Sequence, residues 1–75
     1  MKEKIVLKFI LSGNEKEFMD FCAKHEGMWK RVDRYQDLNG YYRRCLLLVG
    51  TYYEREDHEQ IMDEADHREF NIIVM

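Results

Sequence analysis

The chain has no proline, only two cysteines and no long apolar run. Its longest uninterrupted apolar stretch, Cys45 to Val49, has five residues, whereas a membrane-spanning helix needs about 20. Only three apolar residues separate Lys4 from Lys8, which is too few for the core of a signal peptide. We therefore expect no membrane segment and a cytoplasmic location.

The two cysteines, Cys22 and Cys45, can form one disulfide at most. Secreted domains of this size usually carry several, and both residues lie among apolar neighbours, where a free thiol packs like a small hydrophobic side chain. No Cys-x-x-Cys pair is present to begin a zinc site. We expect two buried structural thiols, no metal and no cofactor.

The length of 75 residues predicts a single domain over 1–75. Apolar residues make up 45% and charged residues 36%, a composition typical of a globular chain with a charged surface. A core this small contributes no more than about 3–5 kcal/mol, so many chains of this size rely on a partner.

Changes in residue pattern along the chain predict six elements. Apolar strands are expected at 4–11, 41–52 and 70–75, a polar extended segment at 28–38, and helices at 15–26 and 57–67. Asn14 is a predicted N-cap with Glu17 as its capping-box partner, and Gly27 stands where a C-cap is wanted.

The dipeptide Asn39-Gly40 is a strong signal for a two-residue hairpin turn, which would join 28–38 to 41–52. The resulting order β-α-β-β-α-β predicts an α+β fold of the ferredoxin-like kind. That fold is expected to have a four-stranded antiparallel sheet in the order 4-1-3-2, with both helices on one face.

Both faces of this expected sheet carry large apolar side chains, although helices would cover only one. A soluble monomer usually makes its uncovered face polar, and the last strand has no lysine or proline to protect its edge. We therefore predict a homodimer through the open face, the last strand, or both. The predicted interface consists of Val6, Ile10, Leu46, Leu48, Ile73 and Met75.

Charge is divided between segments beneath a formal net charge of −3. Residues 28–45 hold five basic and two acidic side chains, interleaved with aromatic residues. Guanidinium groups beside aromatic rings are typical of single-stranded nucleic-acid binding. The candidates for binding a partner or nucleic acid are Trp29, Lys30, Arg31, Arg34, Tyr41, Arg43 and Arg44.

Residues 46–75 are acidic, with eight acidic side chains against two basic ones. They form either a solvated helix face or a surface that docks on a basic partner. The predicted acidic surface consists of Glu56, Glu59, Asp63, Glu64 and Asp66.

No catalytic motif is recognisable. His58 and His67 are nine residues apart, about half a turn out of phase on a helix, and no Gly-x-x-x-x-Gly-Lys phosphate loop is present. We predict a small non-enzymatic binding or regulatory module that contacts itself and an unidentified protein, an inhibitor or adaptor. The alternatives are a binder of single-stranded RNA, DNA or nucleotides through 28–45, and a sensor of a small ligand.

Overall fold

The computed structural model describes residues 7–75, which form four strands, two α-helices and two short 3-10 helices. In chain order the elements are β1 (Lys8–Ser12), α1 (Glu15–Lys24), β2 (Trp29–Arg31), η1 (Tyr35–Leu38), β3 (Cys45–Val49), η2 (Tyr52–Glu54), α2 (His58–His67) and β4 (Asn71–Val74). Both predicted α-helices are confirmed. The extended segments expected at 28–38, 41–52 and 70–75 contain shorter strands, and residues 4–6 of the first expected strand lie outside the described residues. No helix in this part of the chain is long and apolar enough to cross a membrane.

The sheet is wholly parallel and has the order β2-β1-β3-β4. The predicted antiparallel, ferredoxin-like sheet with the order 4-1-3-2 is therefore wrong. The central position of β1 and β3 was expected correctly, but their outer neighbours are exchanged. The chain is a small protein of α-helices and β-strands in which each strand runs in the same direction as its neighbour.

The error arises at Asn39-Gly40, which does not form a hairpin turn. Asn39 has φ −60° and ψ 132°, Gly40 has φ 86°, and the Tyr41 N–H donates to the Leu38 carbonyl over 3.1 Å. These angles describe a type II turn, which needs positive φ only at its third residue and does not match the twist of a hairpin. The turn follows η1 within a crossover, and this crossover lets β3 lie parallel to β1.

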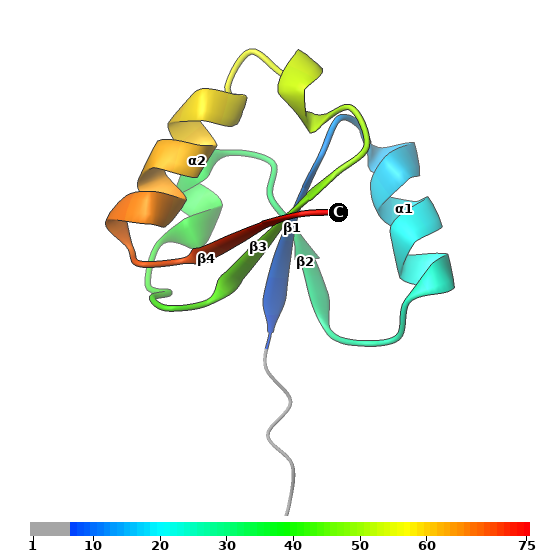
Figure 1. The fold of residues 1–75 in the computed structure, drawn as a ribbon, viewed down its shortest axis with the longest axis horizontal. Helices are drawn as coiled ribbons and strands as arrows, with labels where there is room; N and C mark the ends of the chain where they lie inside the picture. Colours follow the sequence, from blue (N-terminus) through cyan, green and yellow to red (C-terminus); the bar gives the residue numbers. More distant parts are fainter. Residues whose placement is uncertain (1–6) are drawn as a thin grey trace, which may run out of the picture.

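The helices cover both faces of the sheet (Figure 1). On one face, Phe21 of α1 packs on Ile10 and Leu47. On the other, Ile61 and Ala65 of α2 and Leu38 of η1 complete a larger cluster over Phe9, Leu11, Leu46 and Leu48. Parallel sheets covered in this way are apolar on both faces, which explains the apolar excess in the sequence.

This burial removes part of the predicted dimer interface. Ile10 and Leu46 are 0% exposed and Leu48 is 1% exposed within the single chain, so these side chains cannot reach a second copy. Val6 lies outside the described residues. Ile73 and Met75 are exposed, so among the described residues these two remain candidates for the predicted interface.

The structure confirms one of the two helix caps that the sequence predicts. The Asn14 side chain accepts from the Glu17 N–H over 2.9 Å, as predicted for an N-cap. Gly27 is not a C-cap, because α1 ends at Lys24 and its C-cap, His25, is extended at φ −132°. Helix α2 ends in a Schellman motif, in which Phe70 N–H donates to the Ala65 carbonyl and Glu69 has φ 60°.

Candidate functional site

The carboxyl ends of β1 and β3 lie side by side in the middle of the sheet. From there the chain leaves β1 for α1 on one face and β3 for η2 and α2 on the other (Figure 1). Open parallel sheets commonly bind ligands at such a switch point, because the diverging loops leave a crevice between them. The polar groups in this crevice are therefore the first candidates for a site.

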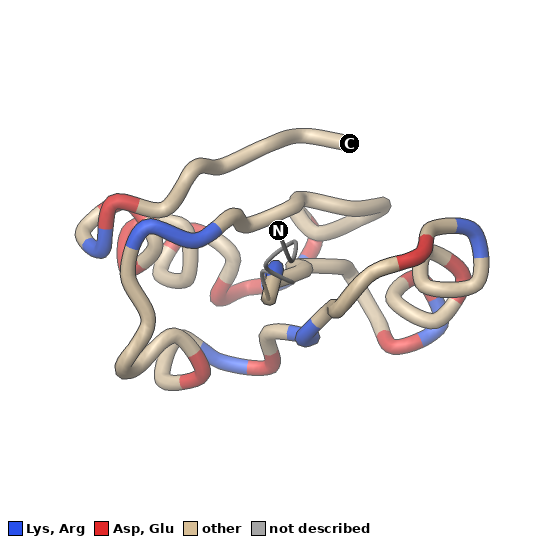
Figure 2. The backbone as a smooth tube through the Cα atoms, turned by 90° about the horizontal axis from the view of Figure 1, so that it is seen from below, with Lys and Arg blue, Asp and Glu red and all other residues tan. Residues whose placement is uncertain are grey.

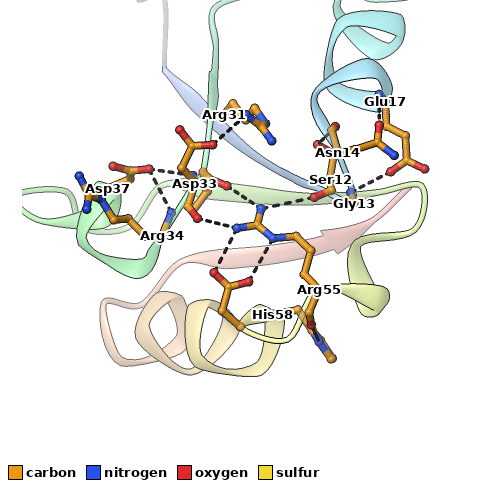
Figure 3. A network of polar contacts seen from close by, with 12 residues as sticks. Ser12, Gly13, Asn14, Glu17, Arg31, Asp33, Arg34, Asp37, Arg55 and His58 are labelled. Carbon is orange, nitrogen blue, oxygen red and sulfur yellow. Dashed lines mark hydrogen bonds and ion pairs between the residues drawn. The ribbon is translucent and has the colours of Figure 1, made fainter.

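The carboxylate of Glu17 lies between the loops that follow β1 and β3. It accepts a hydrogen bond from the Gly13 N–H at 2.7 Å (Figure 3). It also accepts from the Thr51 N–H at 3.0 Å and from the Thr51 hydroxyl at 2.9 Å. The fit requires glycine next to Thr51, because a Cβ on Gly50 would lie 2.5 Å from the Glu17 carboxyl carbon and Gly50 has φ 61°. Glu17 thus joins the loop after β1 to the loop after β3.

Two effects act on the ionisation of Glu17. Partial burial opposes the charged form, but hydrogen bonds from the Thr51 N–H and hydroxyl and from the Gly13 N–H outweigh it and hold the pKa of Glu17 below its usual value. The carboxylate is therefore charged at neutral pH. Its charge occupies the place that the phosphate of a ligand takes in many parallel α/β proteins.

Arg55 binds the neighbouring strand ends together. Its guanidinium donates to the carbonyls of Ser12 (3.4 Å), Val32 (2.8 Å) and Asp33 (2.6 Å), and to both carboxylate oxygens of Asp57 at 3.1 Å (Figure 3). A guanidinium has five N–H groups, and these contacts use all of them. Arg55 therefore joins the ends of β1 and β2 to the start of α2 and has no donor left for a ligand.

Neither the serine at the end of β1 nor the two cysteines form an activated nucleophile. The Ser12 hydroxyl is buried and donates to the Asn14 carbonyl over 2.8 Å. Cys22 and Cys45 are free and half-buried, and burial raises the pKa of Cys22. Within residues 7–75, no cluster of three or more His, Cys, Asp or Glu residues could hold a metal.

The basic and aromatic candidates do not form one surface, because the hairpin that would carry them does not exist. Trp29 packs edge-on against Phe21 on the α1 face, with ring centroids 5.1 Å apart. Arg31 is paired with Asp33 at 2.8 Å, and Arg43 with Glu69 at 3.3 Å. Arg34 lies in the loop that leads into η1 (Figure 3).

Three of these candidates do meet, at the amino end of the sheet on its α2 face. The Lys30 ammonium lies 5.4 Å from the centroid of the Tyr41 ring, and the Arg44 guanidinium carbon lies 5.9 Å from it. Tyr41 in turn packs edge-on against Phe9, with centroids 5.0 Å apart. We call Lys30, Tyr41 and Arg44 the basic-aromatic cluster.

The acidic candidates lie on and just before α2. Glu56, Glu59, Asp63 and Glu64 line an open groove of about 720 Å³ together with Tyr35, Gln60 and His67, whereas Asp66 is exposed outside it. Glu64 is partly neutralised by Arg68, at 2.6 Å. Basic and acidic segments are interspersed around the molecule (Figure 2). The division of charge along the sequence therefore does not give the molecule one basic and one acidic half.

Strand β4 forms an outer edge of the sheet, and its carboxyl end is exposed. Ile73 is 38% exposed, Val74 68% and Met75 57%. Helix α1 contacts β1 and β3 on the face of the sheet that carries Ile10 and Leu47. It leaves a groove of about 410 Å³ there, lined by Phe21, Val49, Met75 and several charged residues. The exposed edge and this groove form a continuous accessible region around Met75.

Comparison of the chain with protein-family models finds no match, and comparison with curated proteins and with solved structures finds no significant one. The site is therefore interpreted from its geometry. The contacts by which Glu17 and Arg55 join the loops and strand ends were not predicted from the sequence. The available signal was a glycine immediately after each central strand, at Gly13 and Gly50, which is typical of tight loops at the carboxyl ends of parallel strands.

Proposed function

We propose that the protein is a small, non-enzymatic, cytoplasmic binding module that forms a homodimer through the edge of β4. The exposed, uncharged edge of β4 is the observation that carries this proposal. The non-enzymatic part is supported by the switch-point crevice, where Glu17 and Arg55 already bond the polar groups that a substrate would need.

The hydrogen-bond pattern of β4 shows which groups a partner would meet. The Asn71 N–H donates to the Arg44 carbonyl at 2.8 Å, and the Met75 N–H donates to the Leu48 carbonyl at 3.0 Å. Because bonding to one neighbour alternates along a parallel strand, the N–H and C=O groups of Ile72 and Val74 point away from β3. Unpaired groups of this kind are the template for strand addition.

A second copy is a suitable occupant of this edge. Two β4 strands related by a two-fold axis would pair in antiparallel fashion and extend one sheet across the dimer. The opposite edge of the sheet, β2, is less suited, because it has only three residues and carries Lys30 and Arg31. Side chains from the partner would also cover Ile73 and Met75.

Substitution of Val74 by proline tests this dimer. Proline removes the outward N–H of Val74 but leaves the bonds between β4 and β3, so we expect a folded monomer. Wild-type protein at tens of micromolar is expected to scatter light as twice its chain mass of 9.2 kDa. Met19→Lys, on the exposed side of α1, is the matched surface control and should remain dimeric. A wild-type mass of 9.2 kDa would contradict the proposal.

A further inference from the structure

Two half-buried cations at the amino end of the sheet have no carboxylate partner among residues 7–75. Most arginines of the chain do have one: the ion pairs are Arg31–Asp33, Arg43–Glu69, Arg55–Asp57 and Arg68–Glu64. Lys30 and Arg44 have no such pair in this part of the chain, although both are partly buried. They therefore differ from Arg31 and Arg43, which are paired, and from Arg34, which is exposed.

These two cations come from different segments and approach one ring. Lys30 is in register with Phe9, which is in register with Leu46, so Lys30 and Arg44 lie on the same face of the sheet, on either side of β1. The ring of Tyr41 lies between these segments and packs edge-on against Phe9. The tertiary structure, not the local sequence, brings these charges together.

Two like charges that lie 5.4 and 5.9 Å from one ring centre repel each other, and the negative face of the ring offsets only a part of this repulsion. An anion that contacts both cations would relieve it further. Guanidinium binds phosphate through two parallel hydrogen bonds, and ammonium adds a point charge. Tyr42 follows Tyr41 in the chain and is 62% exposed, although the Arg68 guanidinium carbon already lies 5.2 Å from the centre of its ring.

We propose that Lys30 and Arg44, positioned by Tyr41, bind the phosphate of a nucleotide, either free or within a single strand. An acidic protein surface is a poorer match, because two cations that converge on one ring suit one compact anion better than carboxylates spread along a helix. The net charge of −3 gives a polyanion little long-range attraction, so binding depends on these short-range contacts.

Fluorescence anisotropy with a labelled single-stranded uridine decamer tests the site. At 50 mM salt we expect saturable binding, and Lys30→Gln and Arg44→Gln should each weaken it at least tenfold. Neutralising one phosphate of a single strand predicts a slope of about −0.7 in log K against log salt concentration, and each substitution should reduce the size of this slope. Arg43→Gln is the matched control, because it removes the same charge from a residue already paired with Glu69.

Competition separates the two sources of the phosphate. Displacement of the decamer by uridine monophosphate at comparable concentration indicates a mononucleotide site, whereas a much tighter decamer indicates a single strand, and either result supports the proposal. Binding of neither probe overturns it. Equal weakening by Arg43→Gln and Arg44→Gln, or displacement by polyglutamate as efficient as by the nucleotide, also overturns it. Unchanged melting temperatures show that the variants are folded. Val74→Pro should bind normally, because Val74 is at the carboxyl end of β4 and the site is at the amino end of the sheet.

Discussion

Replacing Glu17 by glutamine tests whether the carboxylate in the crevice stabilises the fold. Glu17 accepts from three donors, namely two backbone N–H groups and the Thr51 hydroxyl, at 2.7–3.0 Å. A hydrogen bond to a charged group contributes about 1.5–3 kcal/mol when buried, and water access to this half-exposed site reduces the contribution. All three together should contribute about 2 kcal/mol.

Glutamine keeps one carbonyl oxygen, so Glu17→Gln should lose about 1 kcal/mol of unfolding free energy. For a domain of this size, that loss lowers the melting temperature by roughly 4–8 °C. Urea denaturation at pH 7 measures the free energy directly. Glu15→Gln is the control, because Glu15 lies in the same helical turn and should cost no more than about 0.5 kcal/mol.

The pH dependence provides a second check on Glu17. Its pKa is lowered in the folded chain, so its contribution is complete above the unfolded pKa of about 4.3 and is lost as pH falls through the folded pKa. The difference in stability between wild type and Glu17→Gln should therefore narrow below about pH 4.3. Equal stability at pH 7, or a difference that persists unchanged in acid, would refute this account of the crevice.

Two further substitutions test other contacts. Arg55→Lys should lower the free energy of unfolding by about 2–3 kcal/mol in urea denaturation, because lysine has too few donors to replace five hydrogen bonds. The Arg55 side chain is only 15% exposed, so water replaces few of them. A loss below about 0.5 kcal/mol would contradict the role of Arg55 in joining the strand ends. Glu69→Gly should raise stability by about 1 kcal/mol, because φ 60° strains any residue with a Cβ and the exposed pair with Arg43 contributes little. A lower melting temperature for Glu69→Gly would show that the ion pair outweighs the strain.

The apolar pattern of β1 and β3 does not by itself determine what covers the two faces of the sheet. Apolar side chains on both faces of β1 and β3 are compatible with an open face that binds a partner or with helices on both faces. A hairpin turn at Asn39-Gly40 would place both helices on one face and leave the other face open, which is the arrangement predicted from the sequence. Asn-Gly permits more than one turn type, and the type II turn at Asn39 changed the direction of β3 and with it the whole topology.

The candidate sites were predictable only in part. Lys30, Tyr41 and Arg44 were chosen as a basic-aromatic group, and they do lie together, although four other candidates do not join them. Glu17 was predicted to be the capping-box partner of Asn14, and the Asn14 N–H does help to lower the pKa of Glu17. The contact of its carboxylate with Thr51, which is 34 residues away in the chain, was not predicted. Contacts of that separation depend on which strands are neighbours, and residue pattern does not report this.

Local chemistry determined the elements of this protein. Residue periodicity placed both α-helices, Asn14 capped the first of them, and the most apolar segments became the central strands. The direction and neighbours of the strands were decided by tertiary structure, because a parallel sheet covered on both faces buries Ile10, Leu46 and Leu48 without a second copy. The apolar excess that the sequence assigned to an interface is therefore mostly core, and within residues 7–75 the exposed members of the predicted interface are Ile73 and Met75.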